Sequence, residues 1–142
     1  MISRRDFIIS GCTACVLTAA GASLLTSCAS PLPMIKSTAG HSGQLIVDPN
    51  SFVAGKGNLL VVRTKQLEYD ILLVKDPEGY HALYLRCTHE GVGLTPVSNK
   101  IFCSAHGSAF DLKGNVIKEP ALHPLKSFPV EMVSNQIIIN IS

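Results

Sequence analysis

The sequence contains no tryptophan, and only 6% of its 142 residues are aromatic. Charged residues are also scarce, at 15%, and the two signs nearly cancel to a formal net charge of +2. Such a balance lacks the basic excess that nucleic acid attracts, so we expect no nucleic acid among the partners of this chain. Valine, isoleucine and leucine are plentiful instead, which favours a core built from β-strands.

The sequence contains only five cysteines. If the last two, Cys87 and Cys103, bind a metal, none remains in the folded domain for a structural disulfide. Cys12 and Cys15 lie in an uncharged N-terminal stretch. Their Cys-x-x-Cys spacing is typical of redox motifs, but we interpret both as small apolar residues of an export segment. Cys28 ends that stretch, so Cys87 and Cys103 alone remain for the rest of the chain. Such a domain depends on its core and on any bound metal for stability.

The first 28 residues resemble a twin-arginine-type signal followed by a lipoprotein leader. Arg4 and Arg5 precede a stretch from Phe7 to Ile35 that contains no charged residue. The box Leu25-Thr26-Ser27-Cys28 is similar to a bacterial lipoprotein cleavage site, where Cys28 would become the lipidated first residue. An uncleaved membrane anchor is the alternative, because about 20 apolar residues can cross a bilayer. Either reading predicts a membrane-anchored protein on the exported, periplasmic side.

Without residues 1–28, about 110 residues remain, enough for one small domain and too few for a second, catalytic one. We expect residues 29–43, rich in Ser, Pro and Gly, to form a flexible tether, and residues 44–142 to form the domain. Its apolar runs are short, turn signals such as Asp76-Pro77-Glu78-Gly79 separate them, and no convincing helical period appears. The expected fold is all-β and antiparallel throughout, with strands near residues 44–47, 58–64, 69–75, 81–86, 101–102, 116–118, 127–133 and 136–141.

Four side chains suited to metal binding occur in two short segments. Cys87 and His89 form a Cys-x-His pair, and after thirteen intervening residues Cys103 and His106 form a Cys-x-x-His pair. Glycines follow each pair, and glycine lets the backbone come close to a ligand. Thiolates favour iron–sulfur clusters, zinc or Cu(I), while imidazole suits zinc, copper or iron, so the ligand set alone leaves the metal open.

Three other interpretations of these four residues explain the pattern less well. A structural zinc site usually pairs Cys-x2–4-Cys with His-x3–5-His, which is not the order found here. A nucleophilic cysteine–histidine pair would use only two of the four residues and would leave the duplication unexplained. Four unrelated core residues would not account for the glycines beside each pair.

The motifs in this part of the sequence resemble those of the Rieske proteins. In that family two cysteines hold one iron of a [2Fe–2S] cluster and two histidines hold the other. The resemblance implies that Cys87, His89, Cys103 and His106 are the ligands, that Ser108 donates a hydrogen bond to sulfur, and that Pro120-Ala121 belongs to a third, proline-rich loop. It also implies stacked antiparallel sheets with a small inserted cluster-binding subdomain at about residues 86–125. The matching motifs are Cys87-Thr88-His89-Glu90-Gly91 and Cys103-Ser104-Ala105-His106-Gly107-Ser108.

The sequence departs from the quinol-oxidising branch of that family at three positions. Those members have two cysteines that form a disulfide between the ligand loops, where this chain has Val92 and Ala105. Their tyrosine that donates to sulfur is replaced by Phe110. By resemblance we therefore expect a reduction potential between those of the quinol-oxidising members and of the oxygenase ferredoxins.

One-electron transfer is the function that the resemblance implies. All four protein ligands would be occupied by iron, so we expect no substrate chemistry from this chain alone, and its status as an enzyme stays open. The favoured role is an exported carrier or a small subunit of a respiratory or molybdenum-type oxidoreductase, with a redox protein as partner. The alternatives are a quinol-oxidising subunit of a cytochrome bc-type complex, with quinol as partner, and a ferredoxin for a ring-hydroxylating oxygenase. Export argues against the ferredoxin.

Overall fold

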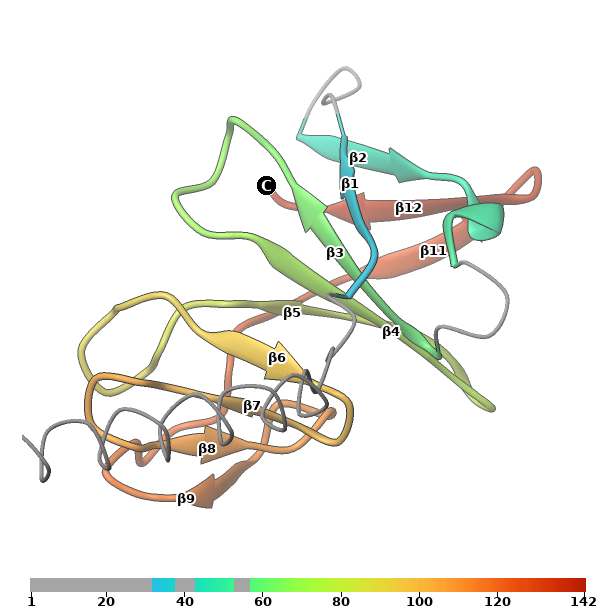
Figure 1. Ribbon diagram of the computed structural model, residues 1–142. Helices are drawn as coiled ribbons and strands as arrows, with labels where there is room; N and C mark the ends of the chain where they lie inside the picture. Colours follow the sequence, from blue (N-terminus) through green and yellow to red (C-terminus); the bar gives the residue numbers. More distant parts are fainter. Residues whose placement is uncertain (1–31, 38–42, 53–56) are drawn as a thin grey trace, which may run out of the picture. The chain divides into compact units, whose positions relative to one another are not determined.

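A computed structural model of the chain describes residues 32–37, 43–52 and 57–142 (Figure 1). These residues form twelve β-strands and one short 3-10 helix, Pro49–Ser51, and they contain no α-helix. No helix in this part of the chain has the length and apolarity needed to cross a membrane. The prediction of an all-β fold is confirmed. Arg4, Arg5, Cys28 and His41 lie outside the described residues, as do Cys12 and Cys15.

Three sheets make up the domain. The largest has five strands in the order β1-β3-β4-β5-β10, namely Met34–Lys36, Leu59–Arg63, Ile71–Asp76, Gly79–Tyr84 and Ser127–Phe128. The second has three strands in the order β11-β12-β2, namely Val130–Val133, Gln136–Asn140 and Gln44–Val47. The third has four strands in the order β6-β7-β8-β9, namely Thr95–Val97, Lys100–Phe102, Ala109–Phe110 and Val116–Lys118.

The five-stranded sheet is buried on both faces. Along β3, Leu59 and Val61 belong to one core cluster, whereas Leu60 and Val62 belong to a second. Successive side chains of a strand point to opposite faces, so an unbroken apolar run shows that both faces are covered. The first cluster also contains Ile101, from the four-stranded sheet. The second cluster is completed by Leu45, Val47, Ile137 and Ile139 of the three-stranded sheet.

The turn between β4 and β5 follows its sequence signal. Asp76 pairs with Gly79 across the hairpin, and the Asp76 carboxylate accepts hydrogen bonds from the backbone N–H groups of Glu78 and Gly79, each at 2.9 Å. The same carboxylate pairs with His81, which is half-buried. Burial by itself would raise the pKa of Asp76, but the hydrogen bonds from His81 and the turn outweigh it and lower that pKa. These interactions therefore stabilise the turn that connects β4 and β5.

The four-stranded sheet and its loops are an insertion between two neighbouring strands. β5 and β10 pair directly, with Ser127 opposite Leu83 and Phe128 opposite Ala82. The chain leaves the central sheet after Tyr84 and returns at residue 127, as Figure 1 shows by the yellow and orange segments between these strands. The inserted subdomain of the expected fold is thus present, and it is anchored at both ends in the same sheet.

The structure corrects the sequence analysis at the start of the domain. Residues 34–36, within the expected tether, form β1, which runs parallel to β3 rather than antiparallel. The backbone N–H of Val61 donates to Pro33 O and that of Ser37 donates to Arg63 O, each at 2.9 Å. This segment pairs the otherwise open edge of β3, and Ile35 packs against the second core cluster. An edge that would remain unpaired accounts for the additional strand.

The predicted strand at residues 127–133 is also wrong as a single element. Pro129 divides it, so that Ser127–Phe128 joins the five-stranded sheet and Val130–Val133 joins the three-stranded sheet. Proline lacks an N–H group and cannot continue a hydrogen-bonded ladder, although its carbonyl still accepts from Asn140 N–H at 3.0 Å. The chain therefore changes sheets at Pro129. The remaining predicted strands are present, with ends that agree to within two residues.

Candidate iron–sulfur site

The first candidate ligand loop is a tight turn that begins at Cys87. The N–H of Gly91 donates to the carbonyl of Cys87, and the N–H of Cys87 donates to the carbonyl of Val92, each at 2.8 Å. Gly91 has a φ of 74°, a left-handed conformation that glycine adopts without steric cost. The guanidinium of Arg86 lies 2.9 Å from where a Cβ on Gly91 would be, so a larger residue here would also displace the end of that side chain. The turn places His89 at its tip.

The second loop repeats this backbone pattern from Cys103 onward. The N–H of Gly107 donates to the carbonyl of Cys103 at 3.0 Å, and the N–H of Cys103 donates to the carbonyl of Ser108 at 2.8 Å. Gly107 has a φ of 82°, so glycine again occupies a left-handed position four residues after the cysteine. The duplication seen in the sequence is therefore a duplication of backbone structure, although His106 stands three residues after its cysteine, at the position that Glu90 holds in the first loop.

The cysteines and the histidines lie in contrasting surroundings. Cys87 and Cys103 are 3% and 1% exposed, belong to the same core cluster, and form no disulfide. His89 and His106 are exposed, and their ring centroids lie 5.1 Å apart with the rings nearly perpendicular, at 86°. The structure thus brings the two thiols into one buried environment and the two imidazoles to one exposed position.

Glu90 lies beside the two imidazoles. Its Oε2 is 3.5 Å from Nδ1 of His106, although the two residues belong to different loops. Possible ligand atoms of His89, Glu90 and His106 all lie within 4.8 Å of one another. The sequence analysis did not single out Glu90, because its contact with His106 joins residues far apart in the chain.

A third segment, residues 120–125, connects the two ligand loops. The Oγ of Ser108 accepts a hydrogen bond from the N–H of Ala121 at 3.0 Å. In the other loop, the Oγ1 of Thr88 donates to the carbonyl of His123 at 2.7 Å. These contacts hold both loops against one segment. Val92 and Ala105 lie in these loops at the positions where the resemblance implies a disulfide in quinol-oxidising Rieske proteins. Thr88 and His123 were missed by the sequence analysis, since no local pattern indicates such a contact.

Ser108 is fully buried, and its replacement provides a local test. We expect Ser108→Ala to cost about 1–3 kcal/mol of unfolding free energy, because the N–H of Ala121 would lose its buried acceptor. The reduction potential should also fall if the hydroxyl proton is donated to sulfur, as the family resemblance implies. Urea unfolding and a redox titration measure the two effects, with the exposed Ser104→Ala as control. Equal stability of the two variants would contradict the structural role of Ser108.

Phe110 and the turn after it follow the second loop in the chain and help to stabilise it. Phe110 is fully buried in the cluster that contains both cysteines. Asp111 then accepts hydrogen bonds from the backbone of Lys113 and Asn115, at 2.9 and 2.8 Å. Burial raises the pKa of Asp111, but the bonds from Asn115, Lys113 and Gly114 outweigh it and lower that pKa. This carboxylate therefore holds the β8–β9 turn as an anion.

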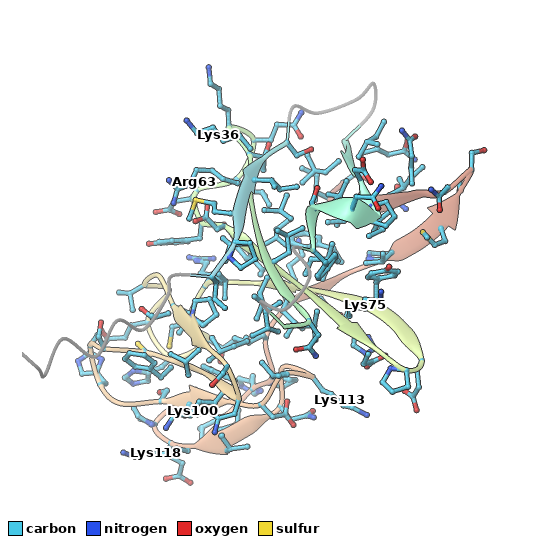
Figure 2. All side chains as sticks on the ribbon, turned by 45° about the vertical axis from the view of Figure 1, so that its right-hand side comes forward. Lys36, Arg63, Lys75, Lys100, Lys113 and Lys118 are labelled. Atoms are coloured by element: carbon cyan, nitrogen blue, oxygen red, sulfur yellow. The ribbon has the colours of Figure 1, made fainter. Side chains whose placement is uncertain are left out.

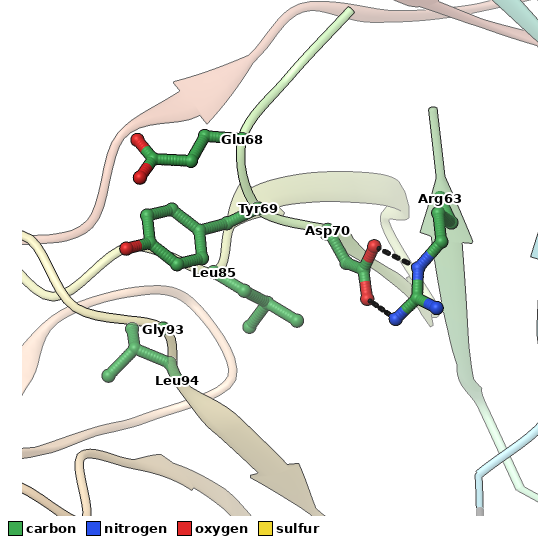
Figure 3. A pocket seen from close by; sticks show the side chains of 7 residues that line it. All are labelled: Arg63, Glu68, Tyr69, Asp70, Leu85, Gly93 and Leu94. Carbon is green, nitrogen blue, oxygen red and sulfur yellow. Dashed lines mark hydrogen bonds and ion pairs between the residues drawn. The ribbon is translucent and has the colours of Figure 1, made fainter. Parts of the chain in front are cut away.

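A cavity of about 240 Å³ lies where the first loop meets the central sheet (Figure 3). The Tyr69 ring packs against Gly93, lying 3.1 Å from the position of a Cβ there. Its burial, with the neighbouring Glu68, raises the pKa of Tyr69. Beside it, Arg63 donates two hydrogen bonds to Asp70, at 2.8 and 2.7 Å. We interpret these contacts as structural, since they position the return of the first loop.

The residues at this site fit a mixed-ligand [2Fe–2S] cluster. Two buried thiols and two exposed imidazoles match a group in which one iron has sulfur ligands and the other has nitrogen ligands. Both loops turn at a glycine directly beside the candidate ligands, which leaves backbone close to any bound group. Cys87, Cys103, His89 and His106 are the residues that would hold it.

Comparison with known proteins gives the same family. The pattern that defines the Rieske [2Fe-2S] domain matches residues 44–129. The chain is 31% identical over 75 residues to the cytochrome b6-f complex iron-sulfur subunit of Chlorobaculum thiosulfatiphilum, which covers 51% of this chain and 41% of that protein. It is 29% identical over 154 residues to the cytochrome b6-f complex iron-sulfur subunit 2 of Nostoc sp. The aligned region covers 98% of this chain and 85% of that protein.

The fold is similar to one solved for a larger enzyme, a quaternary ammonium Rieske monooxygenase named CntA. The TM-score is 0.56 and the sequence identity 19%, with 71% of this chain and 33% of that chain covered. At this identity the likeness concerns the fold alone.

The two ligand loops, the all-β fold and the family match together define a small iron–sulfur protein of the electron-transfer class. The chain belongs to the Rieske [2Fe–2S] family. It carries a [2Fe–2S] cluster and is a Rieske-type electron carrier.

Proposed function

We propose that this chain passes single electrons between partner proteins on the exported side of a bacterial membrane. It acts as a small subunit of a respiratory or molybdenum-type oxidoreductase or as a freestanding carrier. The observation that carries the proposal is the division of the candidate ligands, with Cys87 and Cys103 buried and both histidines exposed at one place. Electrons can then enter and leave only at the histidine end.

The protein residues serve this role by shielding and positioning. When bound, the cluster supplies a centre that takes up and releases one electron. The core around Cys87 and Cys103, including Phe110, keeps water from the sulfur end. His89 and His106 present the outer end to a docking partner, and residues 120–125 hold the two loops together. We assign a carrier rather than a catalytic role because all four candidate ligands would be used to hold the cluster.

Export and membrane attachment rest on the N-terminal sequence. The pair Arg4-Arg5 with the uncharged stretch that follows supports twin-arginine export, and the box ending at Cys28 supports lipidation. An uncleaved anchor would give the same location. Export of an already folded protein is compatible with a cluster inserted beforehand, because both cysteines of the site are buried in the core.

The location can be tested with the full-length chain. Replacing Arg4 and Arg5 together by lysine should leave the precursor in the cytoplasm, because the receptor reads the arginine pair rather than its charge. Cys28→Ala should abolish labelling by a lipid precursor, whereas the wild-type chain, which serves as the control, should be labelled. Protease accessibility in spheroplasts measures the side of the membrane. A double lysine variant that is exported normally, with its cluster, would contradict the twin-arginine route.

A second candidate function is that of the iron–sulfur subunit of a cytochrome b6-f-type complex. The relative from Nostoc carries that name and aligns with 98% of this chain. Against it stand Val92 and Ala105, which replace the cysteines expected of quinol-oxidising members. Purification from native membranes in mild detergent separates the two candidates. Haem b in fixed ratio to the iron of this chain would favour the complex, and its absence together with a low potential would favour the carrier.

A further inference from the structure

Glu90 differs from two other carboxylates near the site because it lies beside a candidate ligand rather than beside an arginine or within a hydrogen-bonded turn. Asp70 is paired with Arg63, and Asp111 accepts several hydrogen bonds within its own turn. In the part of the chain that the structure describes, the only ion-pair partner of Glu90 is the imidazole of His106, at 3.5 Å. The Glu90 side chain is 54% exposed and lies against a candidate ligand.

The position of this carboxylate matters because the histidine end is where the redox centre meets solvent. Glu90 directly follows His89 in the first loop and reaches His106 of the second, so its carboxylate lies within 4.8 Å of a ring nitrogen of each candidate histidine ligand. Adding an electron to the bound cluster adds a second negative charge nearby. Like charges repel with an energy that falls with distance and with the dielectric constant, so the carboxylate disfavours the reduced state.

We propose that Glu90 sets the reduction potential of this protein, holding it below the value that the cluster and its four ligands would otherwise have. The inference rests on the proposed ligand set, and it goes beyond it by assigning a role to a residue that binds no iron. A lower potential makes the reduced carrier a stronger electron donor, so Glu90 selects which partners this chain can reduce.

A charge of opposite sign lies near the second loop. The Nζ of Lys118 is 3.7 Å from where a Cβ on Gly107 would be, which places an ammonium group beside the residue that follows His106. Figure 2 shows Lys118 on β9, in the same lower part of the domain as the ligand loops. The positive charge of Lys118 should raise the reduction potential, whereas the carboxylate of Glu90 lowers it. Lys118 therefore provides an internal control for the sign of the effect.

The test is a redox titration of the cluster-loaded protein in three isosteric or near-isosteric variants. Glu90→Gln should raise the equilibrium constant for reduction about threefold, an order-of-magnitude value for one charge near the protein surface. For a one-electron couple this corresponds to a rise of about 28 mV. Lys118→Gln should lower the potential. Glu131→Gln, an exposed carboxylate on β11 in a different sheet, should leave it unchanged.

Salt separates an electrostatic effect from a structural one. The Debye length falls from about 30 Å at 0.01 M to about 3 Å at 1 M ionic strength, so the difference between Glu90→Gln and wild type should shrink by more than half over this range. The EPR spectrum and the iron content should match the wild type. Should Glu90→Gln fail to retain the cluster, two other variants test the same electrostatic effect. Glu90→Lys should raise the reduction potential and Lys118→Gln should lower it.

Several results would overturn the inference. A potential of Glu90→Gln that equals the Glu131→Gln control, or that lies below the wild type, would show that the carboxylate does not set it. A shift of unchanged size in high salt would show that the substitution acts through altered loop structure. Wild-type protein without iron and acid-labile sulfide would instead contradict the ligand set and the proposed function, and that failure is visible before any potential is measured.

Discussion

Cys87→Ala and Cys103→Ala proteins should contain no acid-labile sulfide, whereas the wild type should contain two irons and two sulfides per chain. Each cysteine is buried at the end of a strand, and no other cysteine is present among the described residues to replace it. Loss of one thiolate would leave the sulfur-bound iron with a single cysteine ligand, one fewer than it needs to be held. His89→Ala and His106→Ala should lose the cluster or change its reduced-state EPR spectrum.

Matched controls are available in the same domain. His81 is paired with Asp76 on the far hairpin, and His123 lies in the third segment with only its carbonyl bound to Thr88. His81→Ala and His123→Ala should therefore retain full iron and sulfide and an unchanged EPR spectrum. Iron and sulfide analysis with EPR measures all six variants. Stoichiometric zinc in the wild type, or full cluster content in either cysteine variant, would contradict the assigned ligands.

Phe110→Ala should destabilise the domain by about 3–5 kcal/mol, the typical cost of removing a buried aromatic ring. Phe110 is fully buried and packs in the cluster that includes Cys87, Cys103 and Ile101. Its loss would leave a cavity directly beneath both ligand loops, in a protein where no disulfide connects them. We therefore expect faster cluster loss on heating as well as lower stability.

The effect can be followed by loss of visible absorbance during thermal unfolding at fixed heating rate, together with urea unfolding. Leu122→Ala is the control, because Leu122 is 74% exposed in the third segment and should cost no more than about 0.5 kcal/mol. Phe110→Leu should fall between the two, since it keeps most of the apolar volume. Equal stability of Phe110→Ala and Leu122→Ala would contradict the assigned core.

The prediction from sequence succeeded where the signal is local. The Asp76-Pro77-Glu78-Gly79 turn, most strands and the two ligand loops each follow from residues within one short segment. Gly91 and Gly107 lie four residues after their cysteines, and both adopt left-handed conformations that only such a local requirement explains. The identities of the ligands and the lipidation of Cys28 stay predictions, as does the boundary of the leader at residue 28.

The sequence failed where contacts join distant segments. Residues 34–36 belong to the segment expected to be a flexible tether, and they become a strand because they pair with the edge of β3. A strand was expected to run through Pro129, yet the two halves pair in different sheets because each finds a different neighbour. Neither outcome is encoded in the local pattern of apolar residues.

The sequence by itself determined the chemistry of this protein: which residue types could bind iron, in which order, on loops between short strands. Cysteine, histidine and glycine at fixed local spacing specify this, because a turn needs only a few consecutive residues. Only the tertiary structure decided that the thiols are buried while the imidazoles are exposed, that residues 120–125 join the loops, and that Glu90 reaches His106. These features depend on burial and on contacts between segments far apart in the chain, which form only when the sheets have packed.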